Sequence, residues 1–107
     1  MFKLFVFIPV DSKEIVKEAL FSAGAGQLGN YSKCSFEVLG KGQFQPNLKA
    51  NPSLGSANEL ELVDEVKLEV LVPRKRLKAT IAAMIEAHPY EEPAYEVLEL
   101  FDTALLA

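Results

Sequence analysis

The chain has 107 residues, which is close to the commonest length of a single domain. Half of its residues are hydrophobic and 24% are charged, a composition typical of a globular core rather than of a disordered segment. The formal net charge of −4 argues against sequence-independent nucleic-acid binding, because that function needs a basic face. The single cysteine, Cys34, excludes an internal disulfide and fits a reducing compartment.

No apolar run in the chain approaches the roughly 20 residues that a membrane-spanning helix needs. The apolar N-terminal run resembles a signal sequence only briefly, because Pro9 and Asp11 interrupt it and no small-residue cleavage site follows. We therefore expect a cytoplasmic protein without membrane contact.

Residues 2–10 are dense in phenylalanine and aliphatic residues, which predicts a strand that is apolar on both faces. Its even-numbered residues form one face, and Phe5 and Phe7 lie on the other. Asp11 or Ser12 is expected to cap a helix, which presents an apolar stripe and ends at Gly24.

Residues 24–29, Gly-Ala-Gly-Gln-Leu-Gly, match the phosphate-binding pattern G-x-G-x-x-G. That function requires a preceding strand and a following helix, whose N-terminus meets the phosphate. Here a predicted helix precedes the motif and a predicted strand follows it. We therefore interpret the glycines as a flexible turn between helix and strand.

Residues 31–39 alternate as in a half-buried strand, which places Cys34 on the same side as Phe36. A glycine-punctuated extension follows at 40–46, and a long loop is expected at about 41–60. Nine residues mark the turns and the loop: Gly24, Gly26, Gly29, Tyr31, Gly42, Phe44, Pro46, Pro52 and Gly55.

Residues 61–72 alternate most regularly, with Leu62, Val66, Leu68, Val70 and Val72 on one face. A helix is expected over 74–88, with an apolar stripe that ends at His88, and Pro89 terminates it. A last short strand is predicted over 95–100.

The predicted order β-α-β-β-α-β folds most simply as a ferredoxin-like α+β domain. Four antiparallel strands form one sheet, and both helices cover one face. Phe5 and Phe7 then point to the uncovered face. Because a small sheet that leaves aromatic rings in water invites association, we expect a homo-oligomer.

The segment from His88 to Tyr95 concentrates the chemically reactive side chains of the chain. The candidate ligands there are His88, Tyr90, Glu91 and Glu92, with Cys34 as a distant partner. Histidine, thiolate and carboxylate suit zinc or copper, so one hypothesis is a divalent metal site built on His88 and Cys34. The alternative is a histidine that is structural and ends the apolar stripe of the second helix.

Five motifs occur in order along the chain: GAGQLGNY at 24–31, CSF at 34–36, GKGQFQP at 40–46, NPSLG at 51–55 and HPYEEPAY at 88–95. They span nearly the whole sequence and resemble the insert domain of the YqfO family, also called NGG-interacting-factor or GTP cyclohydrolase type 2-like proteins. In larger members this domain interrupts a metal-binding core, and here it resembles a stand-alone version.

The insert domain is similar in fold to PII signalling proteins and to CutA, the divalent-cation tolerance protein, which are ferredoxin-like trimers. The resemblance therefore implies a trimer. It does not imply enzyme activity, because the dinuclear metal centre of the larger members uses several histidines outside the insert and this chain has one.

Three functions follow from these observations. The first is a non-enzymatic, PII-like or CutA-like oligomeric module that binds or regulates, with the long loop as its variable part and its ligand unknown. The second is divalent metal binding or metal tolerance through His88 and Cys34. The third is a structural module that docks on a protein partner.

Overall fold

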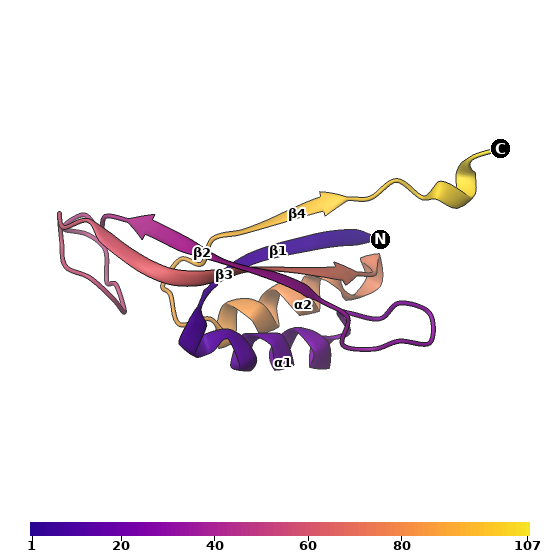
Figure 1. Cartoon of the computed structure of the whole chain (residues 1–107), viewed down its shortest axis with the longest axis horizontal. Helices are drawn as coiled ribbons and strands as arrows, with labels where there is room; N and C mark the ends of the chain where they lie inside the picture. The colour runs from indigo at the N-terminus through magenta and orange to yellow at the C-terminus, as the bar shows by residue number, and fades with distance from the viewer.

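The computed structural model describes residues 1–107 and contains four strands and two helices in the predicted order: β1 (Phe2–Pro9), α1 (Lys13–Ala23), β2 (Phe36–Phe44), β3 (Glu61–Val72), α2 (Arg74–Ala87) and β4 (Tyr95–Glu99). Short 3-10 turns follow β1 and β4, at Val10–Ser12 and Thr103–Leu105. The strands form one antiparallel sheet in the order β2-β3-β1-β4. Both helices cover the same face of this sheet (Figure 1). The predicted ferredoxin-like α+β fold is confirmed.

The core lies between the two central strands and the helices. β1 and β3 pair so that Leu4 faces Val70, Val6 faces Leu68 and Ile8 faces Val66, all of them buried. The helices close this layer with three fully buried side chains: Val16, Leu20 and Met84. Burial of such a contiguous apolar layer is the main stabilising contribution in a domain of this size.

The opposite face of the sheet has no helix over it (Figure 1). Phe5 and Phe7 of β1 pair with Glu69 and Lys67 of β3 on this face, and the Lys67 ammonium lies 4.6 Å from the centroid of the Phe5 ring. Three further apolar side chains on this face are largely exposed: Phe36 (65%), Val38 (51%) and Leu98 (53%). We use the name open face for this side of the sheet, which carries Phe5, Phe7, Phe36, Val38 and Leu98.

The prediction for the second strand was partly wrong. β2 begins at Phe36 rather than at Tyr31, and Tyr31 forms only an isolated bridge with Leu28. Cys34 therefore lies in the preceding loop, and it does not share a strand face with Phe36. Nor is β2 half-buried, because the helices lie beneath β1 and β3 and leave this edge strand in solvent.

The long connection between β2 and β3 also differs from the prediction. Lys41 to Phe44 belong to β2, so the loop covers residues 45–60, which we name the arm. β2 and β3 continue past the end of β1 as a two-stranded hairpin that carries the arm (Figure 1). Leu62, expected on the core face, lies in this extension and is 61% exposed.

The glycine-rich turn after α1 connects a helix to a strand, as the sequence predicts. Gly24 adopts φ +115° and ends α1, and its N–H donates to the carbonyls of Leu20 and Phe21. Gly26 donates its N–H to the Leu71 carbonyl at 2.9 Å and accepts from the Cys34 N–H. Gly26 also adopts φ +83° against the Phe21 ring, so a side chain there would be strained and crowded.

Two lysine–glutamate contacts attach β2 to α1. The Glu37 carboxylate lies 2.8 Å from the Lys13 ammonium and 3.1 Å from the Lys17 ammonium. The hydrogen bond from Lys13 is the main reason that the pKa of Glu37 is lowered from its usual 4.5.

Neither helix of the structure is long and apolar enough to span a bilayer.

Thr80 gives a test of the packing between α2 and the sheet. Its hydroxyl is fully buried and has no hydrogen-bond partner. We expect Thr80→Val to increase the free energy of unfolding by about 1 kcal/mol, because an unpaired buried hydroxyl is costly. Urea denaturation measures the change, with Thr103→Val at an exposed position as the control. A destabilised Thr80→Val variant would show that the hydroxyl has a partner in solution.

Candidate functional site

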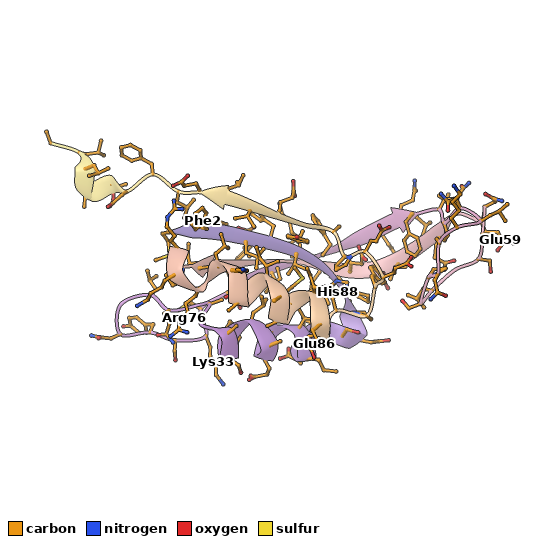
Figure 2. The ribbon with its side chains drawn as sticks, turned by 180° about the vertical axis from the view of Figure 1, so that it is seen from behind. Phe2, Lys33, Glu59, Arg76, Glu86 and His88 are labelled. Atoms are coloured by element: carbon orange, nitrogen blue, oxygen red, sulfur yellow. The ribbon has the colours of Figure 1, made fainter.

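The candidate site is built at the end of α2. Helix α2 ends at Ala87, because His88 is extended, with φ −73° and ψ 137°, and Pro89 cannot continue the helix. The His88 N–H still donates to the Met84 carbonyl at 2.9 Å. The backbone thus fixes the imidazole at the corner between α2 and the segment that leads to β4 (Figure 2).

Both ring nitrogens of His88 are engaged within the protein. Nδ1 accepts the Tyr90 N–H at 3.1 Å, so Nε2 carries the proton in the neutral ring and donates to the Phe7 carbonyl at 2.7 Å. The side chain is 6% exposed. Since neither nitrogen offers a free lone pair, His88 serves here as a structural connection between α2 and β1.

Burial is also the main influence on the protonation of His88. Desolvation lowers its pKa from the ordinary 6.5, and the Phe7 carbonyl and the nearby Glu65 carboxylate oppose this shift. A buried imidazolium would require a second acceptor in place of the Tyr90 N–H. The neutral imidazole is therefore the form that this corner stabilises.

Tyr90 connects the corner to the hairpin formed by β2 and β3. Its hydroxyl donates to Glu65 Oε2 at 2.9 Å. Its ring lies 5.0 Å from the His88 ring and 5.7 Å from the Phe44 ring, measured between centroids. Burial and the Glu65 carboxylate raise the pKa of the Tyr90 phenol, which therefore stays protonated and acts as a hydrogen-bond donor.

Glu65 is the buried carboxylate of the site, with 9% exposure. Tyr90 donates to its Oε2, whereas Oε1 accepts no hydrogen bond and rests against Gly42 of β2. A Cβ at position 42 would overlap Oε1, so glycine is the residue that admits this carboxylate. Gly42, the second glycine of the GKGQFQP motif, thus leaves the space that the Glu65 carboxylate occupies.

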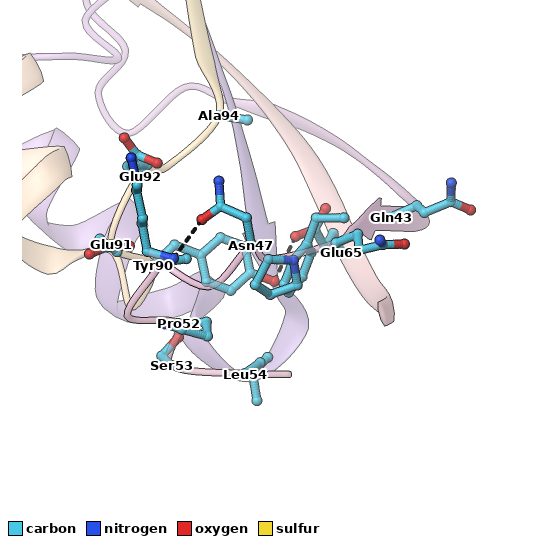
Figure 3. A pocket seen from close by; sticks show the side chains of 15 residues that line it. Gln43, Asn47, Pro52, Ser53, Leu54, Glu65, Tyr90, Glu91, Glu92 and Ala94 are labelled. Carbon is cyan, nitrogen blue, oxygen red and sulfur yellow. Dashed lines mark hydrogen bonds between the residues drawn. The ribbon is translucent and has the colours of Figure 1, made fainter. Parts of the chain in front are cut away.

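The arm folds back over this corner and borders a cavity of about 610 Å³ that is partly open to solvent. Asn51 donates its N–H to Glu91 Oε1 at 3.1 Å, and Asn58 donates its N–H to the carbonyl of buried Pro46 at 2.6 Å. Figure 3 shows Gln43 and Glu65 of the hairpin on one side of the cavity and Glu91 and Glu92 of the corner on the other. Pro52 and Leu54 of the arm lie below them.

The structure brings together most of the predicted site residues, but not Cys34. Tyr90, Glu91 and Glu92 line the cavity with Phe44, Pro46 and Pro52, while His88 supports them from behind. The Cys34 N–H donates a hydrogen bond to the Gly26 carbonyl. Gly26 belongs to the turn that packs, through Gly24, against Arg76 in the first turn of α2. His88 lies at the other end of that 14-residue helix, about 20 Å away. Figure 2 shows Lys33, the neighbour of Cys34, and His88 toward opposite ends of the helix layer.

The metal site that would join His88 to Cys34 is therefore not formed within one chain. No cluster of three or more histidine, cysteine, aspartate or glutamate side chains is placed to hold a metal ion. The turn residues Gly24, Gly26, Gly29 and Tyr31 also lie at the Cys34 end of the molecule. Among the predicted loop residues, Gly55 lies in the arm.

Glu65 was not predicted as a site residue from the sequence. The alternation of residues 61–72 places it on the face opposite the apolar residues, together with Glu61, Lys67 and Glu69. The available signal was Gly42, because a glycine inside a strand often indicates close approach by another group. That signal becomes specific only in the folded sheet, where Glu65 pairs with Gly40 and its side chain reaches Gly42.

Comparison with known proteins supports the family resemblance. No family model matches the chain. Proteins named GTP cyclohydrolase 1 type 2 homolog are 48% identical over 101 residues in Bacillus subtilis, 46% over 100 residues in Halalkalibacterium halodurans and 43% over 98 residues in Mycobacterium tuberculosis. Over nearly its whole length, the chain is similar to one part of proteins of the YqfO/NIF3 family. These matches cover 92–94% of this chain but 26–27% of the relatives, so the chain spans about a quarter of their length.

Solved structures agree with this relationship and with the fold. The Bacillus cereus protein related to NIF3 gives a TM-score of 0.79 at 42% identity and covers 94% of this chain and 26% of its own. CutA1 from Pyrococcus horikoshii gives 0.68 at 16% identity, covering 95% and 85% of the two chains. The PII-like protein CutA from Nostoc sp. PCC 7120 gives 0.62 at 18% identity, covering 99% and 86%. At such low identity the CutA proteins show the shared fold alone.

The pH dependence of stability tests the neutral state of His88. We expect the imidazole to titrate below pH 6.5, measured from its carbon-bound protons by NMR in a chain with one histidine. The unfolded chain binds this proton near pH 6.5 and the folded chain binds it only at lower pH. The free energy of unfolding should therefore fall as pH decreases from 6.5 toward the folded pKa. His88→Gln should flatten this dependence, and a folded pKa at or above 6.5 would contradict burial as the dominant influence.

Removal of the imidazole tests its structural role. We expect His88→Ala to lower the free energy of unfolding by about 1–3 kcal/mol, because the Phe7 carbonyl and the Tyr90 N–H lose their partner. Thermal unfolding with and without added zinc measures the loss, which should be equal in both conditions. Cys34→Ser is the matched control. A zinc-dependent rise in melting temperature that disappears in both variants would restore the shared metal site.

Proposed function

We propose that this domain is a non-enzymatic, oligomeric binding module of the PII-like or CutA-like type, and that its ligand binds between the arm and the corner at Tyr90. The observation that carries this proposal is the cavity of about 610 Å³ at that position. Its volume lies within the range of roughly 300–1,000 Å³ that is usual for small-molecule sites. Its walls combine the two aromatic rings of Phe44 and Tyr90 with eight polar or charged side chains, so the lining is more polar than that of most small-molecule sites.

The chemistry of the cavity favours binding over catalysis. A nucleophile needs a base within hydrogen-bond distance, and Cys34 lies at the far end of α2. His88 uses both nitrogens in structural hydrogen bonds, and the Tyr90 hydroxyl donates to Glu65. The names of the larger relatives describe a cyclohydrolase homologue, but this chain spans about a quarter of those proteins. The binding function is therefore the one that its own residues support.

The open face supports the oligomeric part of the proposal. Phe5, Phe7, Phe36, Val38 and Leu98 leave apolar surface on a sheet that is covered on one side only, and burial against other copies would remove this surface from water. The resemblance to PII and CutA proteins favours a homotrimer. In such an assembly the open faces would meet, and the cavities would remain at the ends that carry the arms.

Native mass spectrometry and light scattering test the assembly. We expect a trimer for the wild type at micromolar concentration and a monomer for Leu98→Glu, because the substitution places a charge within a desolvated interface. Leu48→Glu in the arm is the matched control, since Leu48 is 83% exposed and lies away from the open face. A wild-type monomer, or a trimer unaffected by Leu98→Glu, would refute assembly through this face.

A further inference from the structure

The cavity contains a buried negative charge without a cationic partner. Glu65 is 9% exposed and forms no ion pair within the chain, and its only hydrogen bond comes from the neutral hydroxyl of Tyr90. A carboxylate that is mostly withdrawn from water is ordinarily paired with a cation or hydrogen-bonded. Oε1 of Glu65 accepts no hydrogen bond, but it is not among the fully buried unpaired atoms, so it keeps contact with solvent where Glu65 lines the cavity.

The remaining charges of the lining have the same sign. Glu91 and Glu92 lie across the cavity from Glu65, and Lys49 of the arm is the one basic residue among the lining residues (Figure 3). Lys49 forms no ion pair within 4.0 Å with any carboxylate. Three carboxylates against one ammonium leave the cavity net negative, so it attracts cations and repels phosphates and carboxylates.

The aromatic side chains indicate what kind of cation fits. Phe44 and Tyr90 form a tilted pair with centroids 5.7 Å apart, and both rings line the cavity. Aromatic faces attract ammonium and guanidinium groups, with the larger gain where the cation is desolvated. The carboxylates are not clustered for a metal ion, because no group of three ligands is close enough to hold one. The lining therefore suits an organic cation better than a metal ion.

We infer that the cavity between the arm and the Tyr90 corner binds a small organic cation with a guanidinium or primary ammonium group. This inference rests on the proposed binding function. The cationic group is held by Glu65 and the aromatic pair, and Glu91 and Glu92 contribute attraction from the opposite wall. The apolar part of the ligand contacts the prolines of the arm, Pro46 and Pro52.

Gly42 acts as a positioning residue in this site. It holds the Glu65 carboxylate close to β2, where Tyr90 can donate to Oε2. Gly42→Ala needs no unusual backbone angle, because Gly42 is not among the glycines with positive φ. The added methyl group must therefore act by displacing the end of the Glu65 side chain rather than by straining the backbone.

Three probes that share a butyl chain but differ in the charge of the head group test the inference: planar n-butylguanidinium, its neutral planar analogue n-butylurea and the anionic, tetrahedral n-butylphosphonate. Titration of the full chain is followed by NMR at the resonances of Phe44 and Tyr90 and by calorimetry. We expect n-butylguanidinium to saturate with a Kd of about 1 mM, given its small size. Butylurea should bind at least tenfold more weakly, and butylphosphonate should not bind.

Glu65→Gln keeps the shape of the side chain and removes its charge, and it should weaken n-butylguanidinium binding at least tenfold. Glu69→Gln is the matched control, because it removes the same charge from the same strand at a residue that does not line the cavity. Gly42→Ala should weaken binding as Glu65→Gln does while leaving the chain folded. Equal binding to wild type and Glu65→Gln, or equal binding of the guanidinium and urea probes, would overturn the inference.

Two results separate this inference from the proposed function on which it rests. If butylphosphonate or butylurea perturbs Phe44 and Tyr90 and the guanidinium probe does not, the cavity is a binding site and the inferred ligand class is wrong. If no probe and no broader small-molecule library perturbs these resonances, the proposed binding function fails together with the inference. Added zinc that competes with n-butylguanidinium, in a manner abolished by Glu65→Gln, would assign the site to a metal ion instead.

Discussion

The hydrogen bond from His88 Nε2 to the Phe7 carbonyl, at 2.7 Å, is the contact on which the arrangement of the site depends. It attaches the last turn of α2 to the central strand β1, and therefore fixes where the chain leaves the helix layer. The second ring nitrogen then orients the backbone of Tyr90. From that point the Tyr90 hydroxyl reaches Glu65 on β3 and its ring reaches Phe44 on β2. A single buried imidazole thus sets the relation between the helix layer and the hairpin.

The two faces of the sheet differ in what covers them. The face covered by the helices carries the apolar core, and this core is complete within one chain. The open face carries aromatic and aliphatic side chains among lysines and glutamates, so a partner surface must be both apolar and charge-complementary. The cavity lies where the hairpin extends past β1, beyond the core. Glu65 pairs with Pro9 and therefore lies on the same side of the sheet as Phe7, at the end of the open face.

The fold could be predicted from the sequence because its strongest patterns are local. The alternation of β3, the apolar density of β1 and the stop at Pro89 each follow from the chemistry of neighbouring residues. β2 was less predictable, since an edge strand without a helix beneath it has no need of a regular pattern. Its true start at Phe36 depends on pairing with Glu69, 33 positions further along the chain. Ile15 and Ile85, which match a helical stripe, are exposed because two helices cannot bury their full circumference against one sheet face.

The candidate site was only half visible in the sequence for the same reason. The segment from His88 to Glu92 is contiguous, so its chemistry attracts notice without any knowledge of the fold. Glu65 lies on a strand among other charged residues, and only the folded sheet brings Pro9, Gly42 and Tyr90 next to it. Cys34 presents the opposite case, since its chemistry is suggestive but the length of α2 separates it from His88. Residue type identifies candidates, and topology decides which of them meet.

The cavity combines one rigid wall with one that is loosely held. Tyr90, Glu65 and Phe44 belong to strands or to the corner that His88 fixes, and their positions are determined before any ligand arrives. The arm is connected to this wall by few contacts, including the hydrogen bond from Asn51 to Glu91 at 3.1 Å. Segments with so few buried contacts open at low free-energy cost. For a ligand of the proposed kind, charge and aromatic contact at the rigid wall would determine which ligand binds, while ordering of the arm over it would lower affinity by the entropy lost. Sequence changes in residues 45–60 would then adjust affinity, and changes at Glu65 or Gly42 would alter the kind of ligand accepted.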